Sequence, residues 1–163
     1  MPKWEGFIDI NMALTLTGKL AVRGVPYGWG DKAPSLDCDS AAIHSLDCSG
    51  FIRWLLARSS NQGIILPDGS ANMREWLQQN HRDWLVGNGR DAYESAGYQS
   101  EATEMDFYLC FIDPNSDHAG HVWGVQDGHT LECYGGHGVG RRPFSQAVLM
   151  REVSFVFKVP AKI

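Results

Sequence analysis

The sequence predicts an α+β fold in which amphipathic helices come first and an antiparallel sheet follows. In the first half, apolar residues recur every three to four positions, the period of a helix with one buried face. After about residue 103 the pattern changes to short apolar runs divided by turn signals, such as Asp-Pro-Asn at 113–115 and Asp-Gly at 127–128. Helices and strands segregated along a chain favour an antiparallel sheet over alternating βαβ units.

The chain is long enough for a hydrophobic core of its own. Its 163 residues fit one domain, which we expect to span residues 1–163. A first helix is predicted at residues 7–23, and the Pro and Gly residues at 25–30 end it. A loop at 31–46 follows. The apolar positions that predict this helix are Phe7, Ile8, Met12, Leu16 and Leu20.

Two further helices are predicted, each with a polar residue placed to cap it. The second helix covers residues 48–59 with Asp47 as its N-cap, and the third begins near Ser70. Residues 88–100 are expected to form a polar connector to the sheet. The inner faces are predicted to carry Phe51, Ile52, Leu55 and Leu56 in the second helix, and Met73, Trp76 and Leu77 in the third.

Four strands are predicted, at residues 107–112, 121–126, 130–134 and 153–159. Asp-Gly at 127–128 is suited to a two-residue hairpin turn. Such a turn pairs residue 126 with 129 and places His121, Trp123, Glu132 and Tyr134 on one face of the hairpin. A three-residue turn would shift this register.

Composition and charge exclude several classes of partner. The net charge is −5 and the only basic doublet is Arg141-Arg142, so we expect no nucleic-acid partner. No apolar run reaches the roughly 18–20 residues that span a bilayer, so we expect no membrane insertion. The first residues lack the pattern of a secretory signal, which implies synthesis in the cytoplasm and separate delivery of the protein. We expect a monomer.

Cys48 is the residue with the most distinctive chemical setting. It opens the predicted second helix, where unpaired backbone amides and the helix dipole favour a thiolate. Ser49 and Gly50 are small and leave the sulfur accessible. Cys38 is a rival nucleophile, but it stands between two aspartates that disfavour a thiolate, and no apolar helix follows it. The four cysteines are too few for a disulfide scaffold, so we expect reduced thiols.

A general base and an orienting group are available further along the chain. His121 opens a predicted strand and follows Cys48 in the order nucleophile then base, as in papain-like enzymes. In the predicted hairpin, Glu132 is the diagonal neighbour of His121 and is favoured as the group that holds the imidazole. His137 lies past the strand end and is the alternative.

These motifs resemble the NlpC-type family of papain-like cell-wall cysteine peptidases. The shared residues are Pro-Tyr-Gly-Trp-Gly at 26–30, Asp-Cys-Ser-Gly-Phe at 47–51, Gly-His-Val at 120–122 and Thr-Leu-Glu at 130–132. The resemblance covers residues 12–159 and implies a papain-like fold, with N-terminal helices packed on a central antiparallel sheet. Three features depart from the family pattern: the long loop at 31–46, Glu-Met-Asp at 104–106, and a glutamate as the third residue.

The resemblance implies hydrolysis of amide bonds in peptidoglycan stem peptides, between D-glutamate and a diamino acid. It assigns Cys48 as nucleophile, His121 as base and Glu132 as orienting group, with an acyl-enzyme intermediate. Neither a metal nor a cofactor is implied. It also places four residues at the substrate site: Tyr27, Trp29, Asp47 and Ser49. Tyr27 and Trp29 have an alternative reading as residues that pack the loop onto the core.

The segment 66–73 also resembles type VI secretion amidase effectors, and phage lysis enzymes are other small members of the superfamily. Either origin implies delivery by other proteins, with an immunity or export partner. Alternatives within the enzyme class are an N-acetylmuramoyl-L-alanine amidase or a lipid acyltransferase. Alternatives outside it are a catalytically silent wall-binding protein, or a zinc module built from His118, His121, Cys133 and His137.

Overall fold

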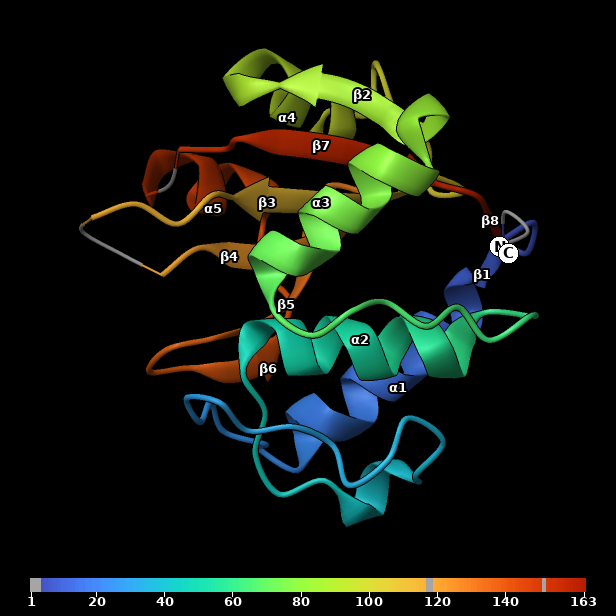
Figure 1. Ribbon diagram of the computed structural model, residues 1–163, viewed down its shortest axis with the longest axis vertical. Coiled ribbons are helices and arrows are strands. Elements are labelled where there is room, and N and C mark those ends of the chain that lie inside the picture. Colours follow the sequence, from blue (N-terminus) through green and yellow to red (C-terminus); the bar gives the residue numbers. More distant parts are fainter. Residues whose placement is uncertain (1–3, 117–118, 151) are drawn as a thin grey trace.

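An antiparallel six-stranded sheet forms the centre of the protein (Figure 1). The computed structural model describes residues 4–116, 119–150 and 152–163. The sheet confirms the predicted α+β fold, and its neighbouring strands are all antiparallel. In spatial order the strands are β2 (Leu85–Asn88), β7 (Phe155–Val159), β3 (Phe107–Ile112), β4 (His121–Gln126), β5 (His129–Tyr134) and β6 (Gly138–Gly140).

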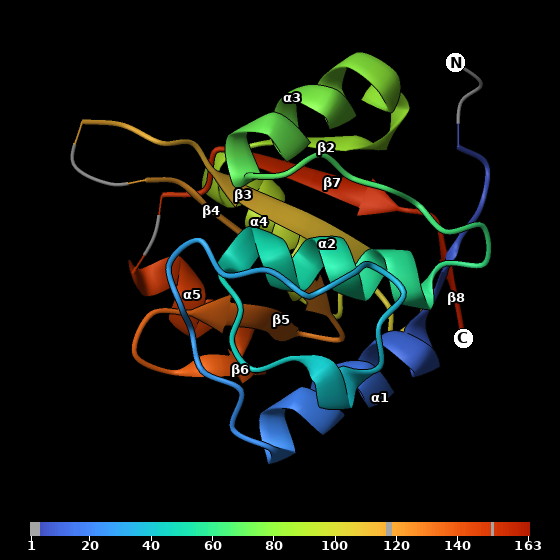
Figure 2. The same ribbon diagram turned by 60° about the horizontal axis from the view of Figure 1, so that its bottom comes forward.

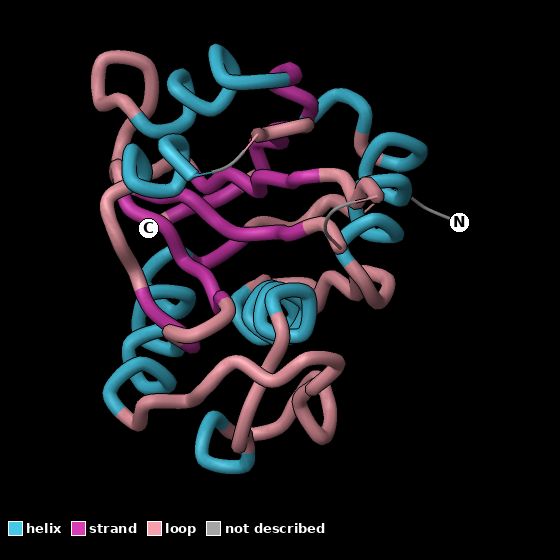
Figure 3. Tube along the Cα trace, turned by 90° about the vertical axis from the view of Figure 1, so that its left-hand side faces the viewer, coloured by secondary structure: helices cyan, strands magenta, loops and turns pink. Residues whose placement is uncertain are grey.

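Helices cover both faces of the sheet (Figure 3). The N-terminal helices α1 (Ile10–Val22), α2 (Cys48–Ser59) and α3 (Ser70–Asn80) share one hydrophobic cluster with one face. The other face is packed against α4 (Gly89–Gly97) and α5 (Phe144–Met150). Because both faces are buried, every residue of β3 is buried and its sequence does not alternate between polar and apolar.

Smaller elements complete the fold. Two 3₁₀ turns, η1 (Ser40–Ala42) and η2 (Arg82–Trp84), lie in the connections. The strands β1 (Ile8–Asp9) and β8 (Ala161–Lys162) form a separate parallel pair. Within the described ranges, no helix has both the length and the apolar character needed to cross a bilayer.

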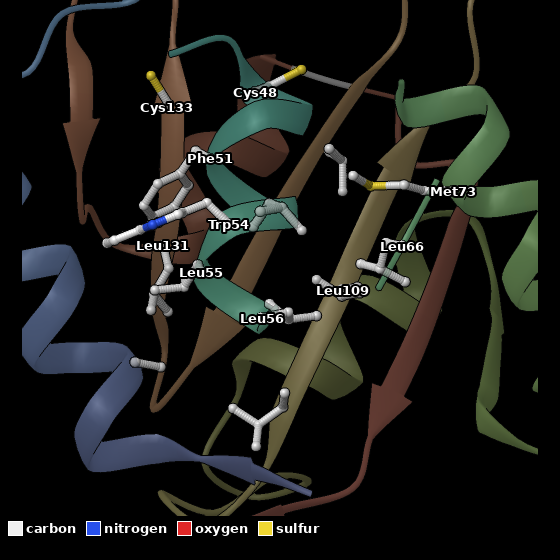
Figure 4. Packing of buried hydrophobic residues seen from close by; sticks show 14 of the residues in the cluster. Cys48, Phe51, Trp54, Leu55, Leu56, Leu66, Met73, Leu109, Leu131 and Cys133 are labelled. Atoms are coloured by element: carbon white, nitrogen blue, oxygen red, sulfur yellow. The ribbon is translucent and has the colours of Figure 1, made fainter. Parts of the chain in front are cut away.

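The central helix α2 has the predicted bounds and the predicted cap. Asp47 Oδ1 accepts a hydrogen bond of 2.6 Å from the backbone N–H of Gly50, which satisfies one of the unpaired amides of the first turn. The helix is buried along its length and packs across β4 and β5. Figure 4 shows its side chains, among them Phe51 and Leu55, between the helix and Leu131 of β5. This packing holds the N-terminal end of α2 against the sheet.

The prediction of a polar connector at 88–100 was wrong, because residues 89–97 form α4. The helix turns Ala92, Tyr93 and Ala96 toward the sheet. Tyr93 is fully buried and its hydroxyl accepts a hydrogen bond of 3.0 Å from Trp123 Nε1. Only these few residues carry the helical period, and the polar residues between them hide it in the sequence.

Other boundaries also differ from the prediction. The first helix begins at Ile10 rather than at residue 7, because Asp9 caps it by accepting a hydrogen bond from the Met12 N–H. Ser70 is the first helical residue of α3 and not its cap; Gly69 occupies the cap position. Trp76 of α3 is only partly buried.

The predicted strands 107–112 and 121–126 have the predicted bounds as β3 and β4. β5 begins one residue earlier than predicted, and the last predicted strand is shortened to the five residues of β7. β2 and β6 were not predicted, since they are short and contain glycine.

The hairpin between β4 and β5 has the predicted two-residue turn. Gln126 pairs with His129, and both turn residues have positive φ, 51° at Asp127 and 71° at Gly128. These angles belong to a type I′ turn, whose twist matches that of the flanking strands. The turn therefore sets the register that brings Glu132 toward His121.

Replacing Gly128 by Ala should lower the free energy of unfolding by about 1 kcal/mol, because a Cβ disfavours positive φ. Gly135→Ala is the matched control, since Gly135 lacks a positive φ and a Cβ there meets nothing within 4 Å. Urea unfolding of both variants measures the difference. Equal losses in the two variants would contradict a strained turn.

Candidate active site

Cys48 is the first residue of α2, and its side chain lies between the helix and the sheet. It is 9% exposed, and its sulfur is within hydrogen-bonding reach of the backbone N–H groups of Val122 and Ser49. Figure 4 shows the sulfur at the N-terminal end of α2, with Cys133 of β5 on the other side of the helix. The start of α2 and the start of β4 thus meet at this thiol.

Burial raises the pKa of the Cys48 thiol above its ordinary value. The N–H of Val122 opposes this effect, Asp47 adds to it, and the N–H of Ser49 and the ammonium of Lys32 also oppose it. We expected the helix start to lower the pKa, but desolvation outweighs it. The resting protein therefore favours the thiol, and a thiolate needs a neighbouring base.

His121 immediately precedes Val122, so β4 carries both the amide beside the thiol and the imidazole. Its Nε2 lies 3.7 Å from Oε1 of Glu132. The ring stacks on Trp123 with 5.4 Å between ring centroids, which restrains its orientation. The carboxylate of Glu132 is completely buried. The structure thus brings these two predicted residues together.

The alternative partner, His137, lies elsewhere in the site. Its ring stacks on Tyr134 with 4.6 Å between centroids, and its side chain is exposed. The geometry of the described residues therefore favours Glu132 as the neighbour of His121.

Arg142, which no sequence pattern singled out, contacts the carboxylate of Glu132. Arg142 Nε donates a hydrogen bond of 2.8 Å to Oε2 of Glu132, and the guanidinium lies over the ring of Tyr134 at 4.3 Å from its centroid. Arg142 follows β6, a strand that was not predicted. Its only signal in the sequence was its place in the Arg141-Arg142 doublet.

A cleft of about 630 Å³ opens beside these residues. Tyr27 lines it, and the pKa of the Tyr27 phenol is raised first by burial and then by the nearby Cys48, Asp47 and Cys133. Trp29 does not line it, and this side chain is 76% exposed on the loop. The cleft is lined by Tyr27, His121, Tyr134, Gly135, His137, Arg142 and Gln146.

Asp47 and Ser49 are held in a polar network beside Cys48. Lys32 Nζ lies 2.7 Å from Asp47 Oδ2 and 2.9 Å from Ser49 Oγ, and 3.3 Å from Asp68. No pattern in the sequence singles out Lys32. This ammonium ties the loop at 31–46 to the start of α2 and neutralises the aspartate next to Cys48.

The remaining alternatives from the sequence are Cys38 as nucleophile and a zinc site. Cys38 is partly exposed in the loop, and its carbonyl accepts a hydrogen bond from Trp54. Of the proposed zinc ligands, His118 lies outside the described residues and Cys133 donates to the carbonyl of Leu46. Among the residues that the structure describes, no group of three or more His, Cys, Asp or Glu side chains is placed to hold a metal ion.

Comparison with known proteins agrees with the fold and the motifs. Residues 24–153 match the profile of the NlpC/P60 family. The chain belongs to the NlpC/P60 family. Membership of this family supports a papain-like cell-wall hydrolase in general terms. No curated protein matches the sequence.

A solved structure shows the same NlpC/P60 fold. It is the crystal structure of a protein described as similar to lipoprotein, of the NLP/P60 family, from Staphylococcus aureus subsp. aureus Mu50. The TM-score is 0.51 at 18% identity, over 94% of this chain and 41% of that one. The chain therefore spans about two fifths of that protein, and the likeness concerns the fold.

The pH dependence of Cys48 alkylation should reveal how the thiol is activated. Because burial raises its pKa, the thiolate in His121→Ala should form only at higher pH than in an ordinary cysteine. In the wild type, the imidazolium should lower the midpoint of the alkylation profile. Iodoacetamide labelling followed by peptide mass spectrometry measures both profiles. Identical midpoints would show that His121 does not activate Cys48.

Proposed function

We propose that this protein is a peptidoglycan hydrolase that cleaves an amide bond of the stem peptide, between D-glutamate and a diamino acid. The observation that carries the proposal is the grouping of a thiol, an imidazole and a carboxylate beside a cleft that His121 lines. The Cys48 thiol lies against the Val122 N–H, His121 is the adjacent residue, and Glu132 lies 3.7 Å from its Nε2. This order of thiol, imidazole and carboxylate suits acyl transfer.

In the proposed reaction His121 takes the proton of Cys48, and the thiolate attacks the carbonyl carbon of the amide. Because Nε2 of His121 faces Glu132, we assign the proton transfer with the sulfur to Nδ1. His121 then protonates the leaving amine, which breaks the C–N bond and leaves a thioester on Cys48. A water deprotonated by His121 hydrolyses the thioester and restores the thiol.

Glu132 holds the imidazole and stabilises its positive charge during both steps. The distance of 3.7 Å is longer than a hydrogen bond, and such contacts tighten when the substrate binds. Within the first turn of α2 the N–H of Gly50 is bonded to Asp47, so we assign the N–H groups of Cys48 and Ser49 as the donors for the oxyanion. In this proposal the buried start of α2 therefore holds the Cys48 thiol and also supplies the hydrogen-bond donors for the oxyanion.

The substrate-binding roles are also part of this proposal. Tyr27 lines the cleft near Cys48, and we assign it a contact with the scissile peptide. Trp29 extends from the same loop and offers an aromatic face to a more distant part of the substrate. Asp47 and Ser49 shape the site through Lys32.

Cys48→Ala should abolish hydrolysis of purified muropeptides while the protein remains folded, because the reaction loses its nucleophile. Mass spectrometry of the products names the bond that is cut and so separates D-glutamyl cleavage from release of L-alanine from the sugar.

Cys38→Ala is the matched control, since this thiol lies in the loop and should be dispensable. Cleavage by Cys48→Ala at the parental rate would refute the mechanism. Loss of activity in Cys38→Ala alone would transfer the role of nucleophile to Cys38.

A further inference from the structure

Glu132 of β5 lies between two basic side chains, His121 of β4 on one side and Arg142, which follows β6, on the other. Arg142 donates to it from Nε to Oε2 at 2.8 Å and from Nη2 to Oε1 at 3.4 Å. His121 Nε2 approaches Oε1 at 3.7 Å. The glutamate side chain is 0% exposed and that of Arg142 is 13% exposed. One buried carboxylate thus joins the imidazole to a permanent cation.

The strand register explains how Arg142 reaches this carboxylate. Glu132 pairs with Gly140 of β6, which has no side chain to stand in the way. Two residues further on, the Thr130 N–H donates a hydrogen bond of 2.8 Å to the Arg142 carbonyl. The Arg142 N–H donates one of 3.1 Å to Oγ1 of Thr130. Thr130 and Glu132 share one face of β5, so Arg142 is the diagonal neighbour of Glu132. The ring of Tyr134 supports the guanidinium.

The charge of Arg142 bears directly on the state of Glu132. Burial favours the protonated form of a carboxyl group, and a cation in contact favours the ionised form. A neutral carboxylic acid no longer stabilises an imidazolium. An arginine supplies this cation at every pH at which the protein is folded, and its planar fork also fixes the orientation of the carboxylate.

We propose that Arg142 is a positioning residue of this active site, which keeps Glu132 ionised and directed toward His121. The proposal rests on the proposed function for the reaction that the site performs. Activation of the Cys48 thiol, however, is measured without any substrate. A failure of the proposed role of Arg142 is therefore distinguishable from a failure of the proposed hydrolase function.

Other titratable groups surround the site and share its electrostatics. They include Cys133 and Tyr134 of β5, His137 after it, Cys48 and Asp47 at the start of α2, Lys32 beside them, Tyr27 of the loop, and Tyr93 of α4 behind Trp123. Because these groups are common to all variants compared below, the difference between variants isolates the pair of Arg142 and Glu132.

The test measures the rate of Cys48 alkylation by iodoacetamide against pH in Arg142→Gln, Glu132→Gln and the double variant. Without its cation, Glu132 takes up a proton more readily, so the thiolate–imidazolium pair should form only at higher pH. We expect the midpoint to rise by about one pH unit in Arg142→Gln. Glu132→Gln should also raise the alkylation midpoint. The double variant should have the same midpoint as Glu132→Gln alone. Arg142→Lys should retain part of the wild-type profile.

Arg141→Gln is the matched control, because Arg141 donates to the carbonyls of Thr130 and Gln126 and serves the hairpin backbone. It should lower stability without moving the midpoint. An unmoved midpoint in Arg142→Gln, or an arginine shift that persists in the Glu132→Gln background, would overturn the proposal. A muropeptide assay run in parallel reports on the proposed function separately.

Discussion

The contact between the start of α2 and the start of β4 is the constraint on which the site depends. It places the Cys48 sulfur against the Val122 N–H and buries it, and the same strand delivers His121 from the preceding position. Burial alone makes the thiol a poor nucleophile, so this packing and the imidazole are useful only together. The hydrophobic face of α2 supplies the energy that holds the two backbone segments in place.

Charge is organised around this contact in two separate pairs. Lys32 neutralises Asp47 on the helix side of the thiol, and Arg142 neutralises Glu132 on the sheet side. A buried carboxylate without a partner would be unfavourable in either position. The aspartate can therefore cap α2, and the glutamate can approach the imidazole, while the site stays close to neutral. Both cations come from irregular segments that wrap around the regular core.

The parts of the structure that could be predicted from the sequence are those fixed by neighbouring residues. Asp47 before an apolar helix, and Asp-Gly between two strands, act over a few positions, so α2 and the register from Gln126 to His129 follow from them. The proximity of the Glu132 and His121 side chains follows from that register. The parts that could not be predicted depend on distant contacts: Arg142 needs β6, Lys32 needs the path of a loop, and α4 is defined by its burial against Trp123.

The parallel pair of β1 and β8 has a consequence for how the domain can be joined to other parts. Ile8 lies beside Ala161 and bridges to Ser60, at the far end of α2 from Cys48. A helix of 12 residues separates that corner from the sulfur by about 18 Å. A segment that continues from β1 or β8 therefore starts beside the end of α2 that is far from Cys48 (Figures 1 and 2).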